Sequence, residues 1–310
     1  MPPAVGGQFW FTETTSTRCL VDVLARARTL GFLGPGPSEV HIAHSLGYLA
    51  ALVGSGSVEG SRLGQGQRPY RALDLGSGGG VPGLVMASAS DQLFMVLLES
   101  SRRRADFLHW ALEELGLSSR VEVVRGRAEE IGRASTHRGA YDAVVARGFG
   151  RPAVTVECAA PFLKVGGCLV VSEPPRSPQA GTPGGSGTPG GSGTPTQAGT
   201  PGGSGSGTSH RPPASHWPEV PEMAGDGSDD WSDDPGSDGN ARDSSEEPSK
   251  AAHDDPTSPD RWPADKLAEL GLERAERLEA AFTYQVLRQR SLCPSSYPRR
   301  TGVPAKRPLY

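Results

Sequence analysis

The fold of this chain is decided by RALDLGSGGGVPG, residues 71–83. The apolar run at 72–75 predicts a short buried strand, and the glycines after it predict a tight turn. Pro82 suits the first turn of a following helix, because its missing N–H would lack a partner there in any case. A strand, a glycine turn and a helix N-terminus together present backbone N–H groups to a ligand. In an open parallel sheet, such a ligand binds at the carboxyl ends of the strands.

Three interpretations of these glycines stay open on the stretch alone. Gly78-x-Gly80-x-x-Gly83 matches the dinucleotide-binding fingerprint, although glycine-rich turns often produce that pattern. Asp74-x-Gly76-x-Gly78-x-Gly80 places an acid at the strand end before the glycines. That arrangement resembles the first motif of class I S-adenosylmethionine-dependent methyltransferases. A purely structural turn is the third possibility.

Composition divides the chain of 310 residues into a folded part and an insertion. Gly (42) and Pro (28) are concentrated between residues 174 and 260, where Gly/Pro/Ser repeats give way to an acidic block over 226–260. A segment with so few apolar residues buries too little surface to offset the conformational entropy that ordering would cost. We therefore expect 174–260 to be disordered. A solvated insertion is the plain interpretation of the acidic block, and a regulatory or RNA-mimicking role is the alternative.

Charge follows the same division. The formal net charge is −4, but residues 174–260 hold 14 acids and 4 bases, which leaves 21 acids and 27 bases elsewhere, or +6. A mildly basic folded part permits a polyanionic partner. The four cysteines have neither zinc nor redox spacing, and no basic region precedes a long apolar run at the N-terminus. We therefore expect a cytoplasmic protein with reduced thiols and no membrane segment.

The order of predicted elements indicates an α/β fold. We expect a flexible segment over 1–16 and a helical cap over 17–67, with helices near 19–30 and 39–53. Apolar runs that alternate with helices then predict a mostly parallel sheet covered on both faces. We place strands at 71–75, 94–98, 121–124, 141–146 and 168–171, helices at 82–89, 101–115, 152–163 and 263–270, and two closing strands over 272–280 and 281–289. The α/β domain thus comprises 68–173 and 261–294. A basic tail, 295–310, has too few aliphatic residues to form a core element.

Polar residues follow the predicted strands where a ligand would lie. Glu99 ends the second strand, where a carboxylate can accept hydrogen bonds from both ribose hydroxyls of an adenosyl group. Ala128 and Glu129 follow the third strand, beside the expected adenine. Arg147 follows the fourth strand and suits planar recognition of a base, with Phe149 two residues on. The plainer alternatives are a helix cap for Glu99, a helix start for Glu129, and an ion pair from Arg147 to Asp74 or Glu157.

Together these residues are similar to one family, the bacterial small-subunit 16S rRNA guanine-N7 methyltransferases, also called the glucose-inhibited division protein B family. The motifs that carry the resemblance span roughly 38–173 and 261–310. They are His41-x-x-His44-Ser45-Leu46, DLGSGGGVPG at 74–83, Leu98-Glu99-Ser100, Arg127-Ala128-Glu129, Tyr141-Asp142 to Ala146-Arg147, PFLKVGG at 161–167 and YPRRTGVP at 297–304. The chain departs from the family pattern at His44, where an Asp or Asn is usual, and at Ser172–Pro175, where a Lys-Gly pair is usual.

The resemblance implies a class I S-adenosylmethionine-dependent methyltransferase, Rossmann-like with a mostly parallel seven-stranded sheet, that methylates N7 of a guanine in 16S rRNA of the small ribosomal subunit. It implies that Gly76, Val81, Ala128, Glu129 and Arg147 contact the cofactor. The glycine turn and the end of the second strand add Gly78 and Glu99 to the predicted contacts. A related methyltransferase acting on another RNA or a small molecule, or a non-catalytic RNA-binding relative, are the alternatives. An NAD-dependent oxidoreductase is disfavoured, since no Tyr-x-x-x-Lys proton donor accompanies the turn.

The chemistry needs little from side chains. Guanine N7 carries a lone pair and no proton, so no general base is required, and alignment of the two reactants supplies much of the acceleration. We therefore name no certain catalytic residue and take Arg147 as the candidate. The histidines show no metal spacing, and His41 and His44 suit core or cap packing. We expect a monomer without metal.

Two basic tracts are candidates for salt-dependent contacts with RNA phosphates. They comprise Arg102, Arg103 and Arg104 in the second βα unit, and Arg299, Arg300, Lys306 and Arg307 in the tail. A solvated surface is the plain alternative for each tract.

Overall fold

The computed structural model of the protein describes residues 15–54, 70–174 and 261–310. The segments expected to be flexible, looped or disordered, namely 1–14, 55–69 and 175–260, lie outside the described residues. Two helices precede the sheet: α1 (Thr15–Thr29) and α2 (Ser38–Gly54). Both match the expected cap, in which apolar positions recur at helical spacing.

The core is one seven-stranded sheet in the order β3-β2-β1-β4-β5-β7-β6. β1 to β5 are parallel to one another, whereas β7 is antiparallel to both β5 and β6. This is the arrangement of class I methyltransferases, as the sequence predicts. The strands are β1 (Tyr70–Leu75), β2 (Leu93–Glu99), β3 (Val121–Arg125), β4 (Tyr141–Ala146), β5 (Leu163–Glu173), β6 (Leu272–Glu279) and β7 (Thr283–Gln289).

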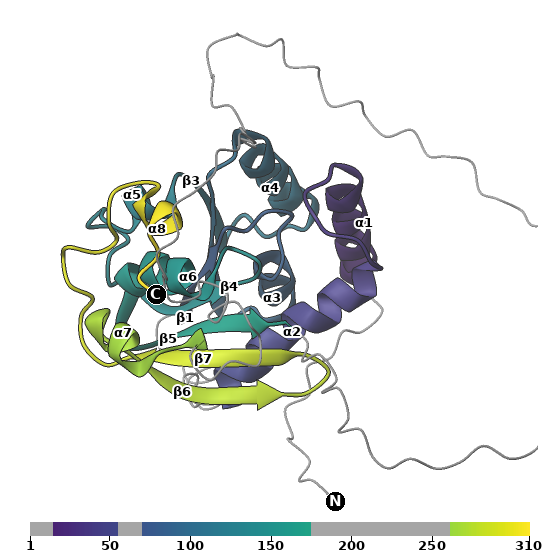
Figure 1. Cartoon of the computed structure of the whole chain (residues 1–310). Helices are drawn as coiled ribbons and strands as arrows, with labels where there is room; N and C mark the ends of the chain where they lie inside the picture. The colour runs from purple at the N-terminus through teal and green to yellow at the C-terminus, as the bar shows by residue number, and fades with distance from the viewer. Residues whose placement is uncertain (1–14, 55–69, 175–260) are drawn as a thin grey trace, which may run out of the picture. The chain divides into compact units, whose positions relative to one another are not determined.

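Helices cover both faces of the sheet (Figure 1). Alternate strand residues point to opposite faces, so that Ala72 and Val145 belong to one hydrophobic cluster and Leu73 and Val144 to another. α1 to α4 lie over the first face, and α5, α6, α7 and the C-terminal segment lie over the second. The remaining helices are α3 (Gly83–Ala89), α4 (Arg102–Glu114), α5 (Ala128–Ile131), α6 (Pro152–Ala159), α7 (Ala264–Glu269) and α8 (Val303–Lys306).

The helix predicted over 152–163 is too long. α6 ends at Ala159, and a single 3₁₀ turn, Ala160–Phe162, leads directly into β5. Pro161 explains the early end, because its ring clashes with the carbonyl one turn back and it has no N–H to donate. β5 also begins earlier than the predicted 168, with an irregular register opposite β4 that accommodates Gly166 at φ +85°.

The prediction that the tail forms no core element is wrong. Tyr297, Leu309 and Tyr310 pack against the second hydrophobic cluster, and α8 lies within the tail. In this tail, aromatic rings and hydrogen bonds hold the chain against the core, a role that aliphatic side chains usually fill. The Arg138 guanidinium, for example, donates to the carbonyls of Cys293, Pro294 and Tyr297 at 2.8 Å each.

The thiols and helices add two smaller findings. All four cysteines are free, with Cys158, Cys168 and Cys293 buried and Cys19 half-buried. Burial raises the pKa of the Cys293 thiol to about 11, which keeps it protonated and unreactive. Within the described ranges, no helix combines the length and the apolar character needed to cross a bilayer.

Candidate cofactor and acceptor site

The candidate site lies where the carboxyl ends of β1, β2, β3 and β4 meet. The strand order reverses at β1, which has β2 on one side and β4 on the other. Ligands of doubly wound sheets bind at such switch points, because the loops after the two diverging strands leave a crevice. The glycine turn follows β1, and Arg147 follows β4.

The glycine turn has the conformation that only glycine adopts readily. Gly76 and Gly78 have φ of +74° and +55°, in the left-handed region. The amides of Gly76 and Ser77 donate to the Leu98 carbonyl at 2.9 and 3.0 Å, which fastens the turn to β2. A Cβ added to Gly83 would lie 2.4 Å from Leu97 and 2.6 Å from the Asp74 carboxylate. Close packing of α3 on β1 therefore requires that glycine.

Glu99, at the end of β2, accepts a hydrogen bond from the glycine turn. Only 4% of its surface is exposed, its Oε2 accepts from the Gly78 amide at 2.9 Å, and its Oε1 accepts from the Ser101 amide at 2.8 Å. The helix-cap interpretation is thus confirmed for one oxygen. Each carboxylate oxygen has a second lone pair, so ribose hydroxyls could still donate to both.

Asp74 is a fully buried acid with one spare oxygen. Its Oδ2 accepts from the Gly83 amide at 2.9 Å, whereas its Oδ1 is buried without a hydrogen-bond partner among the described residues. Burial raises the pKa of Asp74 to about 7, although the Gly83 hydrogen bond opposes the shift. An unsatisfied carboxylate oxygen beside the turn is a feature that a cationic ligand would stabilise.

Arg147 lies half-buried directly after β4. Its Nη2 is 2.8 Å from His41 Nδ1 on α2, and its Nη1 is buried with no partner in the described structure. The predicted alternative, an ion pair with Asp74 or Glu157, is not formed among these residues. Glu157 instead pairs with Arg299.

Two aromatic residues lie at the site, Phe149, which the sequence placed beside Arg147, and Tyr48, which it did not assign to the site. The Phe149 ring lies over the turn, so that a Cβ on Gly76 would be 2.7 Å from its Cδ2. Tyr48, buried on α2, donates to the Ala146 carbonyl at 2.9 Å and accepts from the Ser172 amide at 3.2 Å. Tyr48 thereby ties the cap to the ends of β4 and β5. In the sequence, Tyr48 is one of the apolar positions of the helix predicted over 39–53, and nothing else there points to the site.

Ala128 and Glu129 begin α5, as the plainer interpretation has it. Glu129 is buried, and its Oε1 accepts from the Gly302 amide of the tail at 3.0 Å. Glu129 thus holds the tail through one oxygen, and the lone pairs that remain on its carboxylate could still accept from an adenine amino group beside the backbone at Ala128. The Val81 side chain packs in a small hydrophobic cluster with Leu20, Leu24 and Val85.

The basic candidates separate into surface and internal groups. Arg102, Arg103 and Arg104 are exposed at the start of α4, with Arg103 and Arg104 lying over the Phe32 ring. Arg300, Lys306 and Arg307 are exposed in the tail. Arg299 differs, since its guanidinium donates to the buried Glu157 carboxylate at 2.6 and 2.8 Å.

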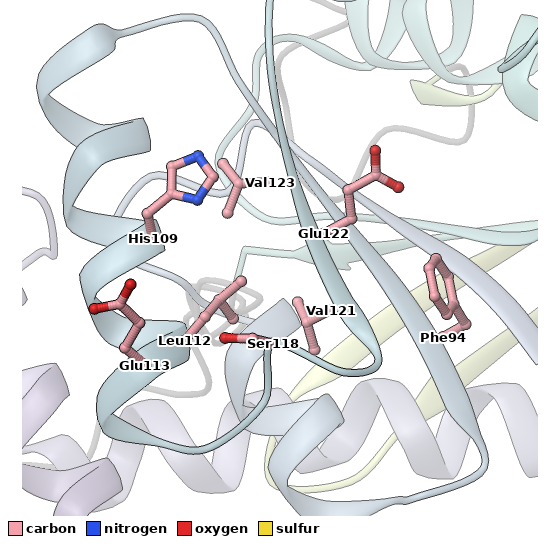
Figure 2. A pocket seen from close by; sticks show the side chains of 8 residues that line it. All are labelled: Phe94, His109, Leu112, Glu113, Ser118, Val121, Glu122 and Val123. Atoms are coloured by element: carbon pink, nitrogen blue, oxygen red, sulfur yellow. The ribbon is translucent and has the colours of Figure 1, made fainter.

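One hollow lies away from this edge. Figure 2 shows side chains of α4 and β3, with Phe94 of β2, around a cavity of about 370 Å³. Val121 and Phe94 stand near the beginning of their strands, opposite the carboxyl ends where the glycine turn lies. This hollow is therefore separate from the candidate site.

The two departures from the family pattern have structural explanations. His44 stacks on Phe282 with ring centroids 4.5 Å apart, and burial with the nearby Arg147 charge lowers its pKa to about 4, so it is neutral. Glu173, at the end of β5, accepts from Trp262 Nε1 at 2.9 Å and pairs with Arg261 at 2.9 Å. Glu173 thus connects the residue range before the insertion with the range after it.

Comparison with known proteins agrees with this geometry. Residues 55–173 match the sequence model of the GidB family, described as rRNA small subunit methyltransferase G. That segment of the chain is similar to this family.

Individual relatives carry the same description. A ribosomal RNA small subunit methyltransferase G from Rubrobacter xylanophilus is 44% identical over 100 residues, which cover 32% of this chain and 38% of the relative. Another from Deinococcus deserti is 34% identical over 141 residues, covering 46% and 54%. The chain thus aligns with about half or less of these GidB relatives. The resemblance outside 55–173 stays an interpretation of the motifs.

Solved structures show weaker likeness. An O-methyltransferase from Bacillus cereus in complex with SAH has a TM-score of 0.38 at 18% identity, over 50% of this chain and 66% of the other. A cofactor-bound protein from MTB, Rv0187, has a TM-score of 0.37 at 21% identity, over 55% and 67%. The fold is defined by the order of the seven strands, which does not depend on these scores.

Proposed function

We propose that the protein is an S-adenosylmethionine-dependent methyltransferase that methylates N7 of a guanine in 16S rRNA of the small ribosomal subunit. The observation that carries this proposal is the glycine turn held by Glu99 at the switch point of a GidB-family sheet. We further propose that 68–173 with 261–294 form the catalytic domain and that 17–67 form its cap. A monomeric state and a cytoplasmic location stay predictions.

The residues present fit the cofactor. The glycine backbone leaves the mouth of the turn open for a ligand, since a Cβ on Gly78 would have no atom closer than 3.6 Å. Glu99 would accept from the ribose hydroxyls, and the backbone at Ala128 would meet the adenine. The buried Asp74 oxygen would stabilise the cationic end of the ligand. When bound, S-adenosylmethionine supplies an activated methyl group on a sulfonium.

The chain's own contribution is binding and alignment. Guanine N7 has a lone pair and no proton to lose, so no residue has to act as a base. Arg147 has a buried Nη1 with no partner in the described part of the chain, so it can donate a hydrogen bond to a bound ring system at the carboxyl edge. Holding the two reactants in line can account for much of the rate acceleration.

The test is transfer of a labelled methyl group from S-adenosylmethionine to small ribosomal subunits from cells that lack this gene. N7-methylguanine is then located by borohydride and aniline cleavage of the rRNA. We expect incorporation at one guanine of 16S rRNA and none into large subunits. Cofactor binding without incorporation into any ribosomal RNA would refute the proposed substrate, and binding of NAD in place of S-adenosylmethionine would refute the class of enzyme.

A further inference from the structure

A buried hydrogen-bonded histidine connects the N-terminal cap to Arg147. His41 lies on α2 and is 5% exposed. Its Nδ1 is 2.8 Å from Arg147 Nη2, and its Nε2 is 3.2 Å from the Gly34 carbonyl. The two partners come from separate parts of the chain, the loop before α2 and the end of β4.

These partners assign the protonation state of the ring. A carbonyl oxygen only accepts, so Nε2 carries the hydrogen, and a guanidinium only donates, so Nδ1 carries none. His41 is therefore neutral in this arrangement. Burial and the Arg147 charge hold the pKa of His41 below its usual value, which agrees with the geometry, while the Gly34 carbonyl acts in the opposite direction.

The contact leaves one end of the guanidinium for a ligand. Nη2 is occupied by His41, whereas Nη1 is buried and has no partner among the described residues. A buried donor without a partner costs free energy unless something else accepts from it. The Arg147 guanidinium is thus held by His41 at Nη2, and its Nη1 can donate to a ligand.

We propose that His41 is a positioning residue of the methyl-transfer site, which orients Arg147 so that Nη1 donates to the bound substrate. This inference rests on the proposed function. It also extends the sequence interpretation of His41 as a packing residue. The cap would then complete the site and not merely cover it.

The proposal implies a dependence on pH. Protonation of His41 would place a hydrogen on Nδ1 and a second positive charge against Arg147, which would break the contact. The other groups facing His41 are Arg28 from α1 and His44 one turn further along α2. Facing Arg147 are Tyr48 of α2, Tyr284 of β7 and Asp74 of β1. Asp74 also titrates near neutrality, so variants at His41 itself are needed to identify the responsible group.

The first measurement does not require activity. In ¹⁵N spectra of histidine, an accepting nitrogen and a protonated nitrogen have different shifts. We expect a protonated Nε2 and an unprotonated Nδ1 for His41 at about pH 7, and a higher His41 pKa in Arg147→Ala because the repelling charge is lost. A protonated Nδ1 in the neutral ring, or a His41 pKa that is the same in wild type and in Arg147→Ala, would overturn the contact.

The second measurement is methyl transfer. His41→Phe keeps the ring and removes the acceptor, so kcat/KM should fall about 10- to 100-fold, as for loss of one hydrogen bond to a charged group. His41→Asn can restore an acceptor near Nδ1, so it should recover most of the rate. Because asparagine does not take up a proton, this variant should lack the fall in rate at low pH that we expect for wild type. His109→Phe, on the exposed surface of α4, is the matched control and should match wild type.

A double-mutant cycle separates positioning from plain structural support. If His41 acts through Arg147, His41→Phe should cost nothing further in an Arg147→Ala background. Equal losses in both backgrounds, or equal losses for the Phe and Asn variants, would overturn the positioning role. If wild type methylates no ribosomal RNA while the ¹⁵N result holds, the proposed function fails and the contact stands. If wild type is active and His41→Phe equals it, only the positioning role fails.

Discussion

Arg299 should be a stability residue and not an RNA contact. It donates to the Glu157 carboxylate from its backbone N at 2.9 Å, from Nε at 2.8 Å and from Nη2 at 2.6 Å. Glu157 lies on α6 and has no exposed surface. Arg299→Ala would remove the two side-chain bonds to Glu157 and a third to the Arg307 carbonyl, and would leave a buried carboxylate without its counter-charge.

The expected cost follows from the burial. Removing one partner of a buried ion pair typically costs about 3–5 kcal/mol, because the remaining charge stays desolvated. For the roughly 195 described residues, each kcal/mol corresponds to about 2–4 °C in Tm, so Tm should fall by about 6–20 °C. Arg299→Lys keeps the charge but not the fork, so it should recover only part of the loss.

Thermal unfolding followed by circular dichroism measures this effect. The adjacent Arg300 is exposed, so Arg300→Ala is the matched control and should change stability by no more than about 0.5 kcal/mol. A normal Tm for Arg299→Ala would refute the buried-pair argument. So would a loss of stability in Arg300→Ala equal to that in Arg299→Ala.

Three further predictions concern cofactor binding, the insertion and pH. Glu99→Ala should weaken S-adenosylmethionine binding measured by calorimetry about 10- to 100-fold, because the turn and the ribose lose a charged acceptor. Replacing 176–259 with a short Gly/Ser linker should leave Tm within a few degrees, because Glu173 already binds Trp262 and Arg261 across the gap. The free energy of unfolding should contain a contribution from His44 that is complete above about pH 6.5 and is lost as pH falls toward 4, since the unfolded histidine takes up a proton first. His44→Phe keeps the stack on Phe282 and should remove that contribution in denaturant titrations.

Each of these three has a result that would contradict it. Unchanged cofactor affinity in Glu99→Ala would show that Glu99 serves only the turn. Loss of cooperative unfolding after the deletion would show that part of the core was removed. Asp74 has a raised pKa and acts in the opposite direction over the same pH range, so only the difference between wild type and His44→Phe is informative. A difference that does not change with pH would contradict the His44 assignment.

Local patterns in the sequence account for most of the fold. Apolar runs at 72–75, 94–98 and 141–146 predicted β1, β2 and β4 to within a residue or two, and the glycine turn predicted where a ligand would bind. These features depend on neighbours in the chain, through side-chain alternation and backbone conformation. The end of α6 lies before the residue that the apolar pattern predicts, because Pro161 cannot continue the helix.

Partners across long stretches of chain were decided only by the tertiary structure. His41 meets Arg147, Glu157 meets Arg299, and Glu129 meets the amide of Gly302, over separations of 106, 142 and 173 residues. A sequence pattern allows several possible partners for each buried charge, and Glu157 is one that it allows for Arg147. Close packing of α2, α6 and the tail around one sheet selects a single partner, because each buried polar group must be satisfied by whatever lies within hydrogen-bond distance.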